Sequence, residues 1–397
     1  MNILSLLSVS APKSLWITLI NWIQSGVGNL GWTIILVTVF IKVVTTPLDF
    51  WVKLNNKKQT LIQQKCSPQV AKLQKKFGAD RNTLNAQTQS LYKREGLDMR
   101  TGCIVMLINT ILSFTIFITF YNDLRKYSAY EAINQYEQIE TSYTEGYKEA
   151  FINYDSEDNF KTAEDVDQWF ASYEAITDEA AKEAEYNDKK AILEYATEAG
   201  SKSAVDTWKA NYSRSSWLWI QNIWVADSNT RAFPSYSALV SIAKDTGYTD
   251  YVNDEIVQAD YDKIAALISD NAPRKDNGYY ILPILAGLVT FLSQYIAELH
   301  TKLKNKKAKA MASSAAADMG STMKVMKIVM PAIMVIFTLT ASASFGLYIL
   351  ASNVATMALG ELIALSVNQL TRKTQREVEA SLEKEANKLI KKGKLKG

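Results

Sequence analysis

Residues 30–51 read LGWTIILVTVFIKVVTTPLDFW, and Lys42 is the only charge in this run before Asp49. A helix rises about 1.5 Å per residue, so the run is long enough to cross a bilayer with Lys42 near the middle. Because a cation at that depth is costly, we expect Lys42 to face a polar cavity that receives something negative from outside the chain. The alternative is a helix that ends near Ile41, with Lys42 snorkelling to the membrane surface.

Five segments are apolar over the length that a membrane-spanning helix needs. They are Leu30–Trp51, Cys103–Tyr121, Tyr279–Ala297, Val325–Ala341 and Phe345–Leu365. The sequence therefore predicts an all-α membrane protein with five core transmembrane helices.

Charge is divided sharply along the chain. Residues 122–276 hold 30 acidic and 15 basic residues, whereas 52–100, 300–324 and 371–397 have net charges of +8, +5 and +5. Basic loops are retained in the cytoplasm. The division predicts a multi-pass protein of the cell membrane with its N-terminus outside, its C-terminus in the cytoplasm and the acidic insertion outside.

These patterns define ten segments. In chain order they are an N-terminal segment (1–29), a first transmembrane helix (30–51), a cytoplasmic helical hairpin (52–102), a second transmembrane helix (103–121), an acidic extracellular helical insertion (122–278), a third transmembrane helix (279–299), a basic cytoplasmic loop (300–324), fourth and fifth transmembrane helices (325–341 and 345–370) and a basic cytoplasmic tail (371–397).

The N-terminal segment permits more than one interpretation. Ser14, Thr18, Asn21 and Ser25 recur at helical spacing opposite apolar residues, which predicts an amphipathic helix lying in the outer interface. A sixth transmembrane helix is the alternative. Met1–Ser10 is apolar but has no basic region before it, so it is a poor signal peptide.

The cytoplasmic hairpin is expected to consist of Val52–Lys65, Pro68–Phe77 and a helix from Arg81 to Arg94. Leu61, Val70, Leu73, Leu84 and Leu91 would form its thin apolar seam. The two cysteines, Cys66 and Cys103, are interpreted as packing residues, because neither is placed for an extracellular disulfide and two cysteines do not make a zinc site.

The acidic insertion is too long for a simple loop. Helical composition predicts helices over Tyr130–Tyr154, Ala163–Ile176, Asp178–Ala199 and Tyr236–Ile268. A solvated structural cap and a specific receptor both remain possible roles.

Several motifs occur in a specific order and spacing. Lys42 lies five residues before Pro47-Leu48, a charged hairpin follows, and Gly102-Cys103 precedes Asn109 by a few residues. Later motifs are Trp217–Trp224, Met330-Pro331, Gly346-Leu347-Tyr348 and Ser352-Asn353. Over residues 15–126 and 216–373 the chain resembles the YidC-type membrane protein insertases, the bacterial relatives of the mitochondrial and chloroplast insertases.

The resemblance implies five core helices around a hydrophilic groove that is open to the cytoplasm and to lipid, with one basic residue in the first core helix. Lys42 stands at that position, where most members have arginine, so the charge is kept while the planar two-pronged donor is lost. The candidate groove residues are Lys42, Thr45, Thr46, Asn109, Gln294 and Glu361. Each polar residue other than Lys42 has the alternative of a plain helix–helix contact.

The predicted function is membrane protein insertion. Short extracellular segments of nascent membrane proteins would pass through the groove, and their apolar helices would partition into lipid without ATP. The chain has no Gly-rich phosphate loop, and no cofactor is expected. Expected partners are nascent membrane proteins, the ribosome through the basic tail, the Sec translocon and anionic lipids. A small-solute or ion transporter that binds its cargo at Lys42 is the alternative, and an enzyme is disfavoured because no catalytic set is assembled.

Overall fold

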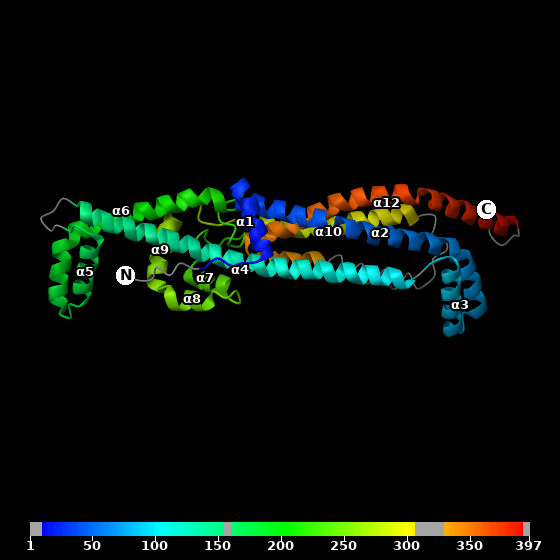
Figure 1. The fold of residues 1–397 in the computed structure, drawn as a ribbon, viewed down its shortest axis with the longest axis horizontal. Helices are drawn as coiled ribbons and strands as arrows, with labels where there is room; N and C mark the ends of the chain where they lie inside the picture. Colours follow the sequence, from blue (N-terminus) through cyan, green and yellow to red (C-terminus); the bar gives the residue numbers. More distant parts are fainter. Residues whose placement is uncertain (1–9, 98, 155–159, 306–328, 392–397) are drawn as a thin grey trace. The chain divides into compact units, whose positions relative to one another are not determined.

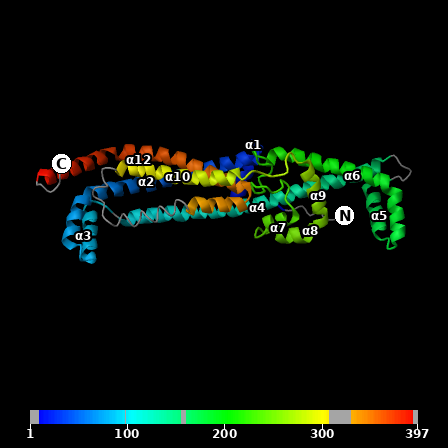
Figure 2. The ribbon, with the colours of Figure 1, turned by 180° about the vertical axis from the view of Figure 1, so that it is seen from behind.

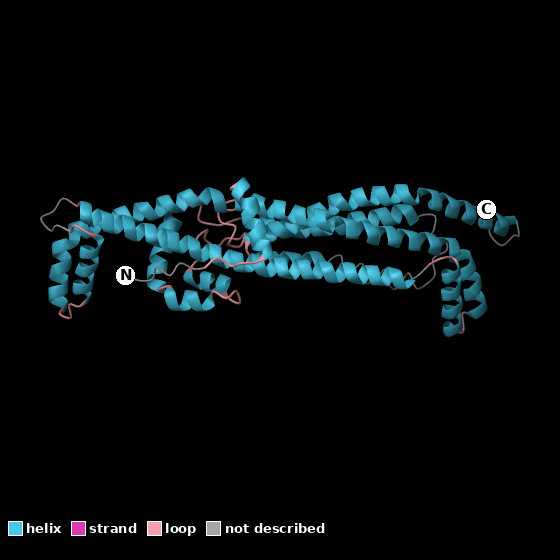
Figure 3. Ribbon diagram, viewed as in Figure 1, coloured by secondary structure: helices cyan, strands magenta, loops and turns pink. Residues whose placement is uncertain are grey.

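The computed structural model describes residues 10–97, 99–154, 160–305 and 329–391. Within these ranges the regular structure is helical, apart from two isolated β-bridges, Trp217 with Ile220 and Arg231 with Asp276 (Figure 3). The helices are α1 (Leu15–Val27), α2 (Leu30–Phe77), α3 (Arg81–Arg94), α4 (Met99–Asn153), α5 (Ala163–Glu174), α6 (Glu179–Ser215), α7 (Tyr236–Ala243), α8 (Thr249–Glu255), α9 (Gln258–Asn271), α10 (Ile281–Asn305) and α12 (Ala343–Lys391). A shorter helix covers Val329–Thr340.

Within the described ranges, three helices are long and apolar enough to cross a membrane: Leu30–Phe77, Ile104–Asn153 and Ala343–Glu385. Two shorter apolar helices, Ile281–Ile296 and Val329–Thr340, lie where the third and fourth transmembrane helices are predicted. The protein is therefore an all-α membrane protein.

The predicted transmembrane helices continue beyond their predicted ends. α2 runs from Leu30 through Pro47 and Pro68 to Phe77, so its apolar half and the first arm of the hairpin form one helix. α4 likewise runs past Tyr121 to Asn153, because no glycine or proline interrupts it between Cys103 and Gly146. Side-chain polarity changes at these boundaries, whereas the backbone stays helical.

The chain divides into two compact units. Unit 1 comprises residues 1–37, 120–285 and 335–348, and unit 2 comprises residues 38–119, 286–334 and 349–397. Each unit combines segments that are far apart in the sequence.

Unit 1 contains the acidic insertion. Figures 1 and 2 both show α4 and α6 side by side there. The two helices approach closely at glycines: a Cβ on Gly200 would lie 2.8 Å from the Tyr143 carbonyl oxygen, and one on Gly146 would overlap Ser203. α5 closes the end of this pair over a buried cluster of Ala150, Phe151, Val166, Ile192 and Ala196.

The segment Tyr236–Ile268 is helical, as its composition predicts. Three helices, α7, α8 and α9, occupy this range. The chain turns between α7 and α8 at Asp245 (φ 59°) and Gly247 (φ 90°), which adopt the left-handed conformation that a continuing right-handed helix excludes. The helix predicted over Asp178–Ala199 is longer than expected, since α6 continues to Ser215.

The Trp-rich segment 217–224 is held in unit 1 by buried asparagines. Asn277 Oδ1 accepts the Asn222 backbone N–H at 2.7 Å, and Asn277 Nδ2 donates to the Asn222 carbonyl at 2.9 Å. Asn222 Nδ2 also donates to Gln135 Oε1 of α4 at 3.0 Å. These bonds satisfy the backbone of an irregular buried segment that has no helix or sheet to do so.

Unit 2 contains the hairpin, formed by the last part of α2 and by α3. Asp80 begins α3 by accepting the N–H groups of Asn82 and Thr83 at 3.0 and 3.1 Å. In the predicted seam, Leu61 and Leu91 are buried, whereas Val70, Leu73 and Leu84 are half-buried. Cys66 is buried beside them as the predicted packing residue, and burial raises the pKa of its thiol. The side chain of Cys103 lies outside the described residues.

Candidate substrate groove

Lys42 lies within α2 and its side chain is half-buried in unit 2. The helix does not end near Ile41, so the alternative of a helix terminus at that point is wrong. The hydroxyls of Thr45 and Thr46 donate to the Lys42 carbonyl at 3.1 and 2.8 Å. One turn of helix thus carries the ammonium and two hydroxyls whose lone pairs are still able to accept hydrogen bonds.

Pro47, directly after this turn, removes one hydrogen bond from the helix backbone. Pro47 has no N–H, so the Val43 carbonyl four residues earlier lacks its usual helical partner. An unpaired carbonyl in a membrane helix is tolerated where it faces protein or water. The backbone near Lys42 therefore adds a second polar feature to the same part of α2.

A carboxylate and a second lysine continue the polar face toward the hairpin. Asp49 is the acidic group whose charge acts on Lys42. It lies seven residues after Lys42, which is two turns, and Lys53 lies one turn further on. We call Lys42, Asp49 and Lys53 the polar stripe of α2. Asp49 and Lys53 are not among the predicted groove residues, although their spacing of 7 and 11 residues after Lys42 places them on the same face of a helix.

The polar stripe contacts α12. Lys53 Nζ donates to the Gly360 carbonyl at 2.7 Å, and Gly360 lies directly before the predicted groove residue Glu361. Glu361 itself is exposed.

The other predicted groove residues lie on α4 and α10 of the same unit. Asn109 and Gln294 are both half-buried. Gln294 follows Thr290 by one helical turn, and Thr290 accepts a hydrogen bond of 2.8 Å from Asn353 of α12. The Ser352-Asn353 motif thus has a structural role in joining α10 to α12. No described contact joins Lys42 to Asn109 or Gln294.

Apolar side chains dominate the surface of α4 in unit 2. The exposed ones are Ile104, Met106, Leu107, Ile108, Ile111, Leu112, Phe114 and Ile118. A contiguous exposed apolar face of this kind suits contact with lipid or with an apolar partner helix.

The cytoplasmic hairpin and the end of α12 meet in unit 2. Lys72 Nζ lies 2.6 Å from Glu385 Oε1, and within the hairpin Lys65 Nζ lies 2.7 Å from Glu95 Oε2. The bond to Glu95 raises the pKa of Lys65 and lowers that of Glu95, and the charge of Glu377 in α12 also raises the pKa of Lys65. The described part of the tail is therefore helical and runs beside the hairpin, while residues 392–397 lie outside the described residues.

The described residues contain no group of three or more histidine, cysteine, aspartate or glutamate side chains that could hold a metal ion. The basic loop predicted over 300–324 lies largely outside the described residues.

Comparison with known proteins agrees with the resemblance. A family model described as "60Kd inner membrane protein" matches residues 22–157 and 169–369. The match therefore also covers much of the acidic insertion, which the motif-based resemblance left out. No solved structure matches the chain.

Several similar proteins carry the name "Membrane protein insertase YidC". The protein of Caldanaerobacter subterraneus subsp. tengcongensis is 35% identical over 112 residues, which cover 28% of this chain and 50% of the relative. The protein of Fusobacterium nucleatum subsp. nucleatum is 31% identical over 99 residues, covering 25% and 46%. That of Wolinella succinogenes is 28% identical over 104 residues, covering 26% and 19%. The matched part thus spans half or less of each of these relatives.

The family match extends over most of the chain and includes the polar stripe of α2, the helices α4 and α10, and α12 as far as residue 369. On this basis the chain belongs to the 60Kd inner membrane protein family.

Proposed function

We propose that the protein is a membrane protein insertase that accepts short extracellular segments of nascent membrane proteins at Lys42 and releases their apolar helices into lipid. The observation that carries this proposal is a half-buried lysine in the apolar part of a 48-residue helix, with two threonine hydroxyls beside it. The name of the relatives supports the same function.

The proposed architecture has five transmembrane helices, with the N-terminus and the acidic insertion outside and the C-terminus in the cytoplasm. Its groove residues are Lys42, Thr45, Thr46, Asn109, Gln294 and Glu361, to which we add Asp49 and Lys53. The lysine charge and the polar side chains reduce the cost of moving a substrate's charged segment through the membrane.

Hydrophobic transfer would drive the substrate's apolar helix along the exposed face of α4 into lipid. Burial of apolar surface is worth about 25 cal/mol per Å2, so a whole transmembrane segment has ample driving force without ATP. The polar stripe has a directional consequence: an acidic segment entering from the hairpin side would meet Lys53 first, then Asp49 and finally Lys42. Asp49 would oppose retention of the acidic segment and favour its release.

Four partners belong to the same proposal. Nascent chains would enter at the groove, the ribosome would contact the basic tail through its RNA phosphates, and the Sec translocon would share substrates. Anionic lipid at the cytoplasmic surface would hold the basic segments in place.

The test is insertion of a single-span substrate with an acidic extracellular segment into vesicles that contain the purified full-length protein. We expect Lys42→Arg to insert the substrate as the unchanged protein does and Lys42→Ala to reduce insertion about tenfold, because only the alanine variant loses the charge. Val44→Ala, two residues away on an exposed position, is the matched control and should have no effect. Equal insertion by the Lys42→Ala variant would refute the proposed role of the charge.

A further inference from the structure

Unit 1 contains a cavity of about 780 Å3 that the insertase proposal does not use. Segments from four parts of the chain form its walls: the outer part of α4, the loop 224–235, α7 and the residues around the start of α12. The lining residues that carry its chemistry are Arg125, Arg231, Ser235, Trp224, Phe337 and Phe345. This volume is within the range of ordinary ligand-binding cavities.

The polar part of the cavity is positively charged. Arg125 and Arg231 both line it, and none of the described residues lining it is acidic. Neither arginine forms an ion pair with a residue that the structure describes. The two arginines contrast with their surroundings, because residues 122–276 have a net charge of −15. The cavity therefore carries local positive charge on an otherwise acidic insertion.

Arg125 is held in place at the cavity wall. Its guanidinium donates to the Lys244 carbonyl at 2.8 Å and lies 5.8 Å from the centre of the Tyr121 ring. Most of the five N–H donors of an arginine remain available after one such bond. A guanidinium fixed by backbone and ring contacts loses little freedom when it binds a phosphate, for which its planar donors are well suited.

The Ser235 hydroxyl and the N-terminus of α7 also lie at the polar wall of the cavity. Ser235 begins α7, and its hydroxyl accepts the Ala238 backbone N–H at 3.4 Å. The positive end of the α7 dipole thus lies at the cavity wall and favours a negative group there.

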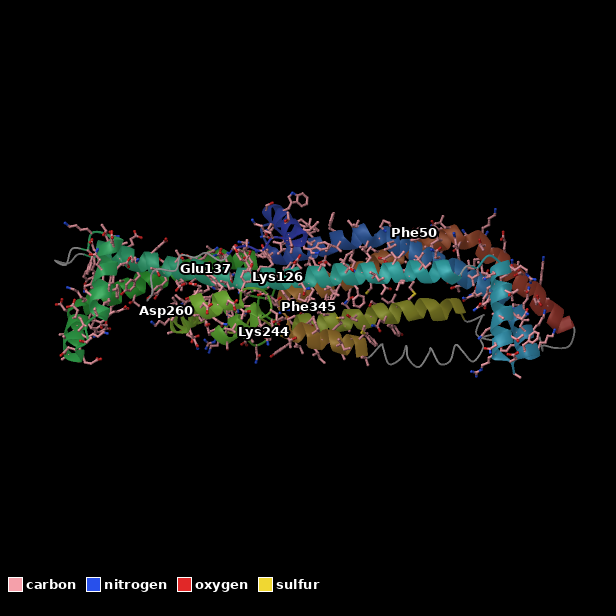
Figure 4. All side chains as sticks on the ribbon, turned by 60° about the horizontal axis from the view of Figure 1, so that its bottom comes forward. Phe50, Lys126, Glu137, Lys244, Asp260 and Phe345 are labelled. Carbon is pink, nitrogen blue, oxygen red and sulfur yellow. The ribbon has the colours of Figure 1, made fainter. Side chains whose placement is uncertain are left out.

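The remaining wall is apolar and aromatic. Leu124, Phe337 and Phe345 line it together with Trp224. Tyr121 and Phe337 stand near the outer ends of the predicted second and fourth transmembrane helices. On the proposed topology, the cavity therefore lies at the level of the outer headgroups, with its apolar wall next to the hydrocarbon. Figure 4 labels Phe345 of this wall and Lys244, whose carbonyl accepts the Arg125 bond.

We propose that this cavity binds the phosphate headgroup of an anionic lipid of the outer leaflet, with the phosphate at Arg125 and Arg231 and the start of an acyl chain against Phe337 and Phe345. Such a lipid would attach to the membrane an insertion whose overall charge repels anionic headgroups. The proposal goes beyond membrane protein insertion and rests only on the topology proposed with it.

The experiment measures lipid binding to the purified full-length protein in neutral detergent by native mass spectrometry. Phosphatidylglycerol and phosphatidylcholine with identical acyl chains are the probes, and inorganic phosphate is the third ligand. The test variant is Arg125→Gln with Arg231→Gln. The matched control is Lys126→Gln, because Lys126 is an exposed cation directly beside Arg125 that does not line the cavity (Figure 4).

We expect the unchanged protein to prefer phosphatidylglycerol roughly tenfold, the double variant to lose that preference and Lys126→Gln to keep it. The Arg125→Lys, Arg231→Lys variant should retain part of the preference, which separates loss of charge from loss of folding. The proposal is overturned if the double glutamine variant keeps the preference, or if Lys126→Gln loses as much. It is also overturned if inorganic phosphate displaces the lipid at equal concentration. No nascent chain is present, so the result does not depend on insertion activity.

Discussion

The carboxylate of Asp227 accepts the backbone N–H of Leu282 at 2.6 Å, across 55 residues of sequence. The same buried side chain accepts the Tyr279 N–H at 2.8 Å and the Trp219 indole N–H at 3.2 Å. Asp227 thus joins the Trp-rich segment to the first turn of α10, where a negative charge is favoured by the helix dipole.

Asp227→Ala should lower the free energy of unfolding of the full-length protein by about 2–3 kcal/mol, because one buried and two partly buried donors lose their acceptor. Thermal unfolding in detergent, followed by circular dichroism, checks this. Asp254→Asn, at an exposed position of α8, is the control and should leave the melting temperature unchanged. A melting temperature of the alanine variant equal to that of the control would show that Asp227 is not structurally important.

Glycine at position 200 is required by the close approach of α4 and α6. A Cβ there would lie 2.8 Å from the Tyr143 carbonyl oxygen, so Gly200→Ala should destabilise unit 1 by about 1–3 kcal/mol. Gly26→Ala is the matched control: Gly26 lies in α1 and a Cβ there would meet nothing within 4 Å. The control should be neutral or stabilise the protein by up to about 1 kcal/mol, since alanine favours a helix. Gly200→Ala should therefore lower the melting temperature while Gly26→Ala does not, and equal melting temperatures of the two variants would contradict the proposed packing.

The stability of the acidic insertion should depend on pH through Glu140 of α4. Burial raises the pKa of its carboxyl above 4.5, and the nearby charges of Asp260 and Glu137 raise it further, while the hydrogen bond with Tyr136 opposes the shift (Figure 4). The folded protein thus holds this proton to higher pH than the unfolded chain does. The stabilisation is fully present below about pH 4.5 and is lost as the pH rises through the folded pKa.

We therefore expect Glu140→Gln to gain melting temperature relative to the unchanged protein at neutral pH and to match it more closely near pH 5. Glu145→Gln, at an exposed position five residues further along α4, is the control and should show the same pH dependence as the unchanged protein. A Glu140→Gln variant with an unaltered pH dependence would rule out Glu140 as the titrating group.

Capping residues in the sequence predict where some helices begin, but the sequence does not show where the long helices end. α1, α3 and α5 begin where Ser14, Asp80 and Thr162 accept backbone N–H groups of the first turn, and such caps are readable in a sequence. α2, α4 and α12 continue past the predicted ends because the change from apolar to charged side chains marks the membrane surface, not a helix end.

In the candidate site, too, some residues could be predicted from the sequence and some contacts could not. Lys42 was identifiable because it is a single charge in a long apolar run, and Asp49 and Lys53 were identifiable by helical spacing from it. The bond from Lys53 to Gly360 joins residues 307 positions apart, and the cavity at Arg125 and Arg231 combines four separate segments. Contacts of that kind depend on tertiary packing, which one sequence does not disclose.

Site-specific photocrosslinking from position 42 tests the central proposal most directly. A photoreactive residue replaces Lys42 while a single-span membrane protein with an acidic outer segment is being translated, and the matched position is Val44, which is exposed on the same helix. The proposed groove predicts crosslinks to the nascent chain's outer segment from position 42, and crosslinks mainly to lipid or to the apolar segment from position 44. Crosslinks to the outer segment from neither position, with positions on α4 and on Val329–Thr340 equally silent, would contradict an insertase groove at Lys42.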